Sequence, residues 1–177
     1  ENVGIAGIGI GVGILGLHFQ KPALVSLGFA VAMLHVLNHA FFKCLLFYAA
    51  GAIYRTTQTI DLERLGGLIR KMPQTSVFFL IGGLAISALP PFNGFVSEFL
   101  LYSALFSHQI PDAMGGAFWV MEGALLAFIG GISALAMARV FGIAFLGVPR
   151  DPRIQCTGEA PLSMRFSMAV HTAGVLV

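Results

Sequence analysis

Three titratable side chains stand close together in an otherwise apolar stretch of the sequence. The segment 34–47 reads LHVLNHAFFKCLLF and places His35, His39 and Lys43 at intervals of four residues. On an α-helix these positions form one stripe about 12 Å long, at ~1.5 Å of rise per residue. Ionisable residues inside a membrane span usually face a protein or water-filled interior and mark an ion or proton path. We therefore predict that the stripe passes protons. The alternative is a histidine pair in the protein core with a lysine that reaches to the lipid headgroups.

A carboxylate forms the second candidate site. Glu98 follows Ser97 in the segment 92–100, FNGFVSEFL, just after two consecutive prolines. A carboxylate beside an interrupted helix can be hydrated by the cavity that the interruption creates. We expect Glu98 to load or release a proton on the same pathway. The alternative is a carboxylate paired permanently with a basic residue such as Arg139.

Two further charges lie in the next apolar stretch, and we predict a structural role for them. Arg139 cannot readily lose its proton, so it is a poor relay group. Glu122 is close enough to the start of the stretch to reach the membrane interface. A structural ion pair or a phospholipid contact is the expected role. Cys44 in an apolar segment and Cys156 in a polar one indicate neither a disulfide framework nor a metal site.

The composition is that of a membrane protein. Of 177 residues, 57% are hydrophobic and 10% are charged, and the mean hydropathy is +0.87. A soluble domain carries about 25% charged residues. The net charge of +2 and the absence of a basic stripe argue against nucleic acid as a partner. We predict an all-α polytopic membrane protein.

The apolar stretches predict a bundle of about five transmembrane helices, each of which needs ~20 apolar residues. The five candidate spans are 2–18, 23–54, 74–107, 117–146 and 163–177. The segment 147–162 is predicted to be a loop, and 163–177 the start of a further helix. Because the chain begins and ends within apolar runs, we expect it to be part of a longer protein.

The third span is predicted to be discontinuous at 90–94. It contains Pro90 and Pro91, followed by Asn93 and Gly94. Each proline lacks an N–H group and clashes with the carbonyl four residues before it, so the helix should break there. Discontinuous helices recur in ion-coupled transporters. A tight hairpin that joins two short spans is the alternative.

The basic residues predict the topology. The loop 55–72 contains four of them and the loop 147–162 contains two, whereas the loops at the opposite end contain only Lys21: the six are Arg55, Arg64, Arg70, Lys71, Arg150 and Arg153. If 74–107 is one broken span, both basic loops lie on the same face, which the positive-inside rule assigns to the cytoplasm. Two separate spans would place them on opposite faces.

Three local patterns favour structural interpretations. Within the first basic loop, four apolar residues share one helical face, which predicts a short amphipathic helix at the membrane surface: Leu62, Leu65, Leu68 and Ile69. In the fourth span, small residues recur every four positions and predict close helix packing: Gly130, Ala134, Ala138 and Gly142. The run 11–16 matches G-x-G-x-x-G, but it lacks the strand and the acidic residue that a dinucleotide site requires.

Three segments together resemble a known family. They are HVLNHAFFKCLLFYAAGAI, DLERLGGLIRKMP and IGGLAISALPPFNGFVSEFL, and the tail FGIAFLGVPRD adds to them. The sequence resembles the antiporter-like membrane subunits of respiratory complex I, group 4 membrane-bound hydrogenases and multisubunit sodium/proton antiporters. Within this family it is most similar to the hydrogenase-4 and formate hydrogenlyase branch.

The resemblance implies a fold and a function. Residues 1–146 would be the second half of a proton-conducting membrane domain, within a larger antiporter-like fold. Lys43 and Glu98 would belong to the intramembrane proton path, and His35 and His39 would flank the lysine. Some complex I subunits carry lysine at the position of Glu98, so the site tolerates either sign.

The resemblance also implies partners and a location. The chain would be a non-redox subunit of a proton-translocating oxidoreductase in a bacterial or archaeal inner membrane. Its partners would be other membrane subunits and the peripheral redox subunits of a hydrogenase or dehydrogenase. Since nothing in the sequence resembles a haem, iron–sulfur or flavin site, we expect no cofactor and no catalytic redox site in this chain. The alternatives are a sodium/proton antiporter without electron transfer and a purely structural scaffold.

Overall fold

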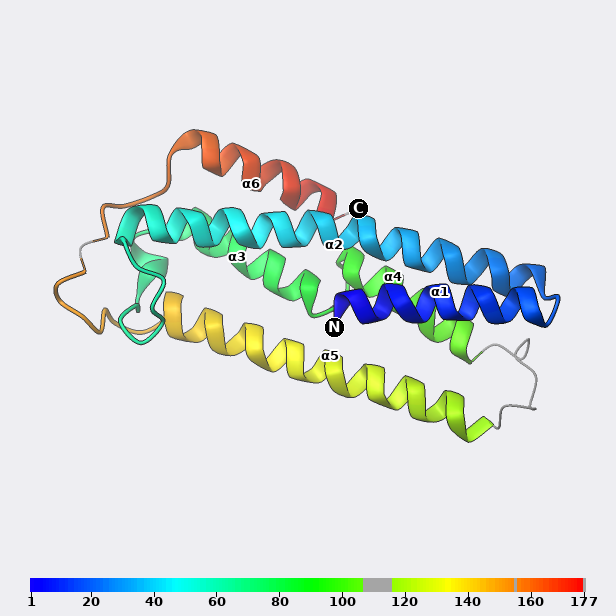
Figure 1. Cartoon of the computed structure of the whole chain (residues 1–177). Helices are drawn as coiled ribbons and strands as arrows, with labels where there is room; N and C mark the ends of the chain where they lie inside the picture. The colour runs from blue at the N-terminus through cyan, green and yellow to red at the C-terminus, as the bar shows by residue number, and fades with distance from the viewer. Residues whose placement is uncertain (107–115, 155, 177) are drawn as a thin grey trace.

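The computed structural model describes residues 1–106, 116–154 and 156–176, and in these residues the chain is helical without any strand. Figure 1 shows an elongated bundle in which α2 runs nearly the full length, with α1 along its first half and α6 along its second. The elements are α1 (Asn2–His18), α2 (Pro22–Thr57), the 3-10 turn η1 (Leu68–Arg70), α3 (Pro73–Ile86), α4 (Asn93–Leu105), α5 (Gly116–Phe145) and α6 (Leu162–Val175). The prediction of an all-helical fold is confirmed.

The helices coincide with the five predicted apolar segments, but not all are long enough to cross a bilayer. By length and composition, α2 and α5 could each span a membrane, whereas α1 and α3 are shorter apolar helices. The number of about five spans therefore stays a prediction. Residues 107 and 177, with which the third and fifth predicted spans end, lie outside the described residues.

Glycines let α1 and α2 pack closely against each other. A Cβ added at Gly28 would overlap the backbone of Gly13 and the carbonyl of Gly9, and one at Gly16 would lie 2.6 Å from the backbone nitrogen of Val25. Only residues without a Cβ permit this approach between helices. The last two glycines of the G-x-G-x-x-G run thus contact the neighbouring helix.

Gly28→Val is expected to destabilise the protein by about 1–3 kcal/mol, because the added side chain forces α1 and α2 apart. The measurement is the thermal stability of the full-length protein in detergent. Gly11→Val is the matched control, since a Cβ at Gly11 has no neighbour within 4 Å. Equal melting temperatures of the two variants would contradict this account of the glycine contacts.

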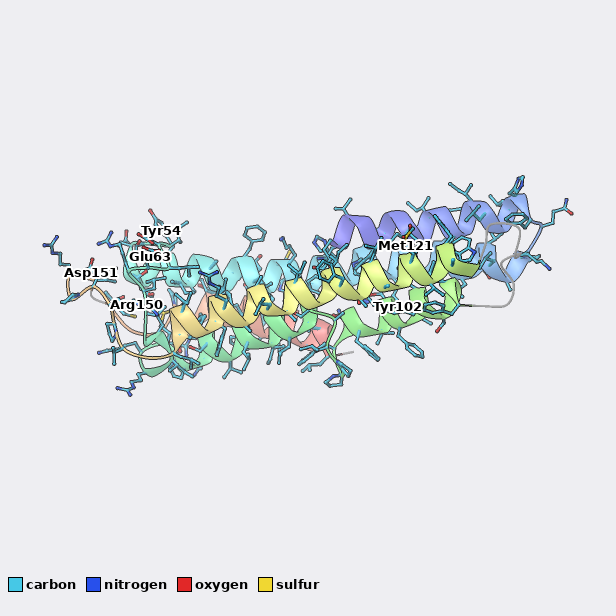
Figure 2. All side chains as sticks on the ribbon, turned by 90° about the horizontal axis from the view of Figure 1, so that it is seen from below. Tyr54, Glu63, Tyr102, Met121, Arg150 and Asp151 are labelled. Carbon is cyan, nitrogen blue, oxygen red and sulfur yellow. The ribbon has the colours of Figure 1, made fainter. Side chains whose placement is uncertain are left out.

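The third apolar segment is interrupted between α3 and α4. The two helices follow one another in the same direction along the bundle in both views, rather than folding back as a hairpin (Figures 1 and 2). In the connection, the Ser87 hydroxyl donates to the carbonyl of Gly83 over 2.8 Å. A Cβ at Gly94 would collide with the carbonyl oxygen of Ala85, so the close approach of the two half-helices requires glycine there.

The two basic loops meet at one end of the bundle. Arg64 forms an ion pair with Asp151 at 2.9 Å, and the Arg150 guanidinium donates to the carbonyl of Leu65 over 2.8 Å. Figure 2 shows Glu63, Arg150 and Asp151 at this same end. The backbone N–H of Arg153 and the Arg64 guanidinium lower the pKa of Asp151 below its ordinary value. The two basic loops thus lie at the same end of the bundle and are joined by an ion pair and hydrogen bonds.

The predicted amphipathic helix in the first basic loop is wrong. Only the three-residue turn η1 is helical there, and Ile69 is exposed while Leu65 and Leu68 are buried. Gly67 has a φ of +67°, a conformation that ends regular helix and favours glycine. The second basic loop also approaches so closely that a Cβ at Gly66 would overlap the carbonyl of Val148. Leu65 and Leu68 pack into the hydrophobic core of the bundle without forming a helical face.

The small-residue stripe of α5 has no close helix partner among the described residues, so the predicted close packing against another helix stays a prediction. A Cβ at Gly130 or Gly142 would have no neighbour within 4 Å in the described residues. The contacts of α5 with the core come instead from large side chains such as Met137 and Phe141. A cavity of about 350 Å³ lies between α3 and α5 beside the stripe, and Ala134, Ala138 and Gly142 contribute to its lining.

Candidate functional site

His35 lies at the meeting point of three helices. Its side chain is 2% exposed, its Nδ1 lies 2.8 Å from the Ser97 hydroxyl of α4, and its Nε2 lies 3.2 Å from Oδ1 of Asn2 in α1. The N-terminus of α1 reaches this level because α1 begins near the middle of the bundle (Figure 1). A buried imidazole with polar partners on both nitrogens can exist in either charge state.

Glu98 is buried in the first half of α4, directly after Ser97. Its side chain is 8% exposed, and the only ion pair within the described residues is the one between Arg64 and Asp151. Glu98 therefore does not pair with Arg139 within this part of the chain. The carboxylate lies within two helical turns of the interruption, since α4 begins at Asn93.

Arg139 and Glu122 do not contact one another. Both lie on α5, Arg139 exposed and Glu122 half-buried, and they are 17 residues apart, which corresponds to about 26 Å along a helix. Neither takes part in the ion pair that the described residues contain. Arg139 thus faces outward, where lipid or another part of the protein can meet it.

The stripe of His35, His39 and Lys43 turns out of the core along α2. His35 is buried, His39 is half-buried with its ring edge against Phe42, and Lys43 is exposed with its amine 5.5 Å from the ring centroid of Phe47. A step of four residues advances ~400° around the helix, so two steps turn the direction by about 80°. The structure therefore brings His35 to Ser97 but leaves Lys43 on the outer surface of this chain.

Lys43 lines a shallow apolar groove rather than a closed channel. The groove has a volume of about 260 Å³, and its walls come from α2, α3 and α5: Leu46, Phe47, Ala50, Phe79, Ile86 and Met137. A cation beside apolar walls needs a polar partner or water if lipid is not to contact it. This groove is the place where such a partner would have to lie.

Polar side chains surround the interruption, and they include Asn38 and Thr172, which the sequence interpretation did not assign to the site, beside the predicted Asn93. Asn38 donates to the carbonyl of Asn93 over 2.9 Å, and Asn93 donates to the carbonyl of Gly174 over 3.2 Å. The Asn93 Oδ1 and the hydroxyl of Thr172 are buried and lack a hydrogen-bond partner in the described residues. Buried polar groups are normally satisfied, so the interruption offers positions for water. Asn38 could have been found from the sequence, as a polar residue between the two histidines in an apolar segment.

Glu159 is a second residue that the sequence interpretation missed. Its carboxylate accepts hydrogen bonds from the backbone N–H groups of Gln74 and Thr75 and from the Thr75 hydroxyl, at 2.9, 3.3 and 2.5 Å. A carboxylate at a helix N-terminus satisfies free N–H groups and interacts favourably with the helix dipole. The second basic loop therefore holds the start of α3. No local sequence signal indicates this cap, because its partners are 85 residues apart.

The described residues contain no group of three His, Cys, Asp or Glu side chains that could hold a metal ion. The chemistry that the observed arrangement supports is the exchange of protons among buried groups. Imidazole and carboxylate can both take up and release protons, and the polar positions at the interruption can hold the water that connects them.

The family model described as "NADH:quinone oxidoreductase/Mrp antiporter, TM" matches residues 11–130. Among curated proteins, hydrogenase-4 component B of Escherichia coli K12 is 40% identical over 178 residues, covering 98% of this chain and 26% of that protein. Formate hydrogenlyase subunit 3 of the same organism is 39% identical, covering 95% and 28%. Among solved structures, an archaeal membrane-bound sulfane sulfur reductase gives a TM-score of 0.70 at 28% identity, covering 85% of this chain and 23% of its own.

The chain belongs to the family of NADH:quinone oxidoreductase and Mrp antiporter membrane subunits. The resemblance drawn from its motifs is thereby confirmed. The chain spans about a quarter of the length of the curated relatives it matches. It shares the fold of one part of these larger membrane proteins.

Proposed function

We propose that the protein is a proton-translocating, non-redox membrane subunit of an oxidoreductase complex. The observation that carries this proposal is the buried contact of His35 with Ser97, next to Glu98 at the helix interruption, which has no ion-pair partner among the described residues. A helix interruption with buried polar groups and no fixed ion pair is suited to moving protons rather than to holding a static structure. The fixed-charge scaffold is disfavoured, since Glu98 has no ion-pair partner in the described residues.

We infer that the groups that complete the proton pathway around Lys43 belong to other segments of the full-length protein. Residues 1–146 would form the second half of the conducting domain, 147–162 a cytoplasmic loop, and 163–177 the start of a further span. The apolar groove at Lys43 supports this inference, because an exposed lysine in such a groove needs a polar partner from elsewhere. The remaining segments of the protein would cover this groove and bring the amine into the interior.

The partners would be other membrane subunits and peripheral redox subunits. The relatives in Escherichia coli are named as one subunit of formate hydrogenlyase and one component of hydrogenase-4, and these names imply enzymes with several chains. Electron transfer would take place in those partners, and this chain would need no cofactor of its own. Protons would be the transported ion, in the inner membrane of a bacterium or archaeon.

A sodium/proton antiporter is the second candidate. One Na(+)/H(+) antiporter chain of Bacillus subtilis is 35% identical over 123 residues, covering 70% of this chain and 15% of that protein. The two candidates differ in their driving force. An oxidoreductase subunit needs electron flow, whereas an antiporter exchanges the ions down an existing gradient.

The deciding experiment uses inverted membrane vesicles that carry the full-length protein with its co-purifying partners. Proton uptake is followed with a pH-sensitive dye, once after an electron donor is added and once after a sodium gradient is imposed across the vesicle membrane. We expect uptake only with the electron donor. Uptake that follows the sodium gradient and is indifferent to the donor would assign the protein to the antiporters.

A thiol-labelling experiment tests the topology. With Cys44 and Cys156 replaced by Ser, Glu63→Cys should react with a membrane-impermeant reagent from the cytoplasmic side only, because it lies in a basic loop. Lys21→Cys, in the exposed turn at the opposite end of the bundle, should react from the other side only. Labelling of both positions from one side would exclude the proposed orientation of the bundle.

A further inference from the structure

The hydroxyl of Ser97 lies within hydrogen-bond distance of two groups but can donate a hydrogen bond to only one of them. Its Oγ lies 2.8 Å from Nδ1 of His35 and 3.0 Å from the carbonyl oxygen of Gly94. The Ser97 side chain is fully buried, at 0% exposure. A hydroxyl donates one hydrogen bond and can accept two. It can therefore donate to His35 or to Gly94, but not to both at once.

When both ring nitrogens of His35 are protonated, its contacts with Ser97 and Asn2 can both be hydrogen bonds. The Gly94 carbonyl can only accept, so a Ser97 hydroxyl that donates to it must accept from Nδ1–H of His35. On the other side of the ring, Oδ1 of Asn2 also only accepts and therefore needs Nε2–H. The protonated ring donates from Nδ1 to Ser97 and from Nε2 to Asn2 without any change in the heavy-atom positions.

The neutral ring fits the same positions after one rotation. If the Ser97 hydroxyl turns toward Nδ1 and donates to it, His35 needs a proton on Nε2 only, which it donates to Asn2. No heavy atom has to move. The Gly94 carbonyl then no longer accepts a hydrogen bond from the Ser97 hydroxyl. It remains in place for the regular helical hydrogen bond with the N–H of Glu98, four residues later in α4.

We propose that Ser97 is a positioning residue for proton exchange at His35, with a hydroxyl that alternates between the imidazole and the Gly94 carbonyl. The rotation links the charge of His35 on α2 to the first turn of α4, one residue before Glu98. This inference rests on the proposed function. The charged and titratable groups that act on this region are His39 and Lys43 on α2, Glu98 and Tyr102 on α4, and Glu1 before α1.

The test compares Ser97→Ala with Ser97→Thr in the full-length protein within its complex. Ser97→Ala removes the hydroxyl, and the protonated ring loses more than the neutral ring because hydrogen bonds from charged donors are roughly twice as strong. We expect donor-driven proton uptake to fall about tenfold, and its half-maximal point to move by about one pH unit toward lower pH. Ser97→Thr keeps the hydroxyl and should restore the wild-type pH profile.

Ser76→Ala is the matched control. Ser76 is equally buried and donates to a backbone carbonyl, that of Met72 over 2.7 Å, but its hydroxyl has no imidazole neighbour in the described part of the chain. Its pH profile should equal that of the wild type. An unchanged profile in Ser97→Ala would overturn the proposal, because proton exchange at His35 would then not depend on the Ser97 hydroxyl.

The same measurements on His35→Gln separate this inference from the proposed function. If His35→Gln pumps normally, the assignment of His35 to the pathway fails, and the role of Ser97 fails with it. If His35→Gln is impaired while Ser97→Ala keeps the wild-type rate and profile, only the inference about Ser97 fails.

Discussion

Lys43→Met is expected to lower donor-driven proton uptake on the order of a hundredfold, the scale on which a positioned proton-transfer group contributes. Methionine has a similar length and an apolar end, so it fills the same space without a titratable group. The variant should assemble, because methionine suits the apolar walls of the groove and Lys43 forms no ion pair within the described residues, where its amine lies 5.5 Å from the ring centroid of Phe47. Such a cation–π contact contributes only about 0.5–1 kcal/mol.

Lys71→Met provides the comparison for Lys43→Met. Lys71 is also exposed, but it lies in the basic loop at the end of the bundle. Its replacement should leave the rate of proton uptake unchanged. Uptake and the yield of assembled complex are measured on the same vesicles. A Lys43→Met protein that takes up protons at the wild-type rate would remove this lysine from the pathway.

Glu98→Gln is expected to reduce proton uptake by about tenfold or more, with a change in stability below about 1 kcal/mol. Glutamine keeps the shape of the side chain but cannot ionise. Because Glu98 has no ion-pair partner in the described residues, the substitution leaves no charge of this chain stranded. Glu98→Asp retains a carboxylate and should keep part of the activity.

A fixed ion pair with a segment beyond the described residues would give a different result. Removal of one partner of a buried pair costs about 3–5 kcal/mol, because the other charge stays buried without compensation. Thermal stability and proton uptake should therefore be measured on one preparation of Glu98→Gln, with Glu122→Gln as the control. A loss of stability that parallels the loss of uptake would refute the assignment of Glu98 as a proton site.

The helices and the interruption follow from local properties of the sequence. Apolar runs of sufficient length predict the helical segments, and two prolines followed by Asn93 and Gly94 predict the interruption, because the missing N–H groups act on the carbonyls within the same turn. The structure has α3 end at Ile86 and α4 begin at Asn93. The placement of both basic loops at one end follows from the same reasoning. If 74–107 is one broken segment, it runs along the bundle once, and the span 117–146 then returns the chain to the end at which the first basic loop lies.

The direction in which each side chain points depends on how the helices are packed. A spacing of four residues predicts one stripe of His35, His39 and Lys43, but the stripe turns by about 80°, and the contacts of α2 decide where it leaves the core. The structure buries His35 and exposes Lys43. The predicted amphipathic helix failed for a related reason: Gly66 and Gly67 allow the second basic loop to approach, a contact that no local pattern contains.

Hydropathy and proline chemistry act over a few neighbouring residues, so the membrane character, the helical segments and the helix interruption could be predicted from the amino-acid sequence. The same local patterns singled out the four titratable residues of the candidate pathway. The contact of His35 with Ser97 and the capping of α3 by Glu159 became visible only in the folded chain. These contacts join residues 62 and 85 positions apart. Their formation depends on which helix faces pack together, and that is set by the combined packing of the whole bundle rather than by any one segment.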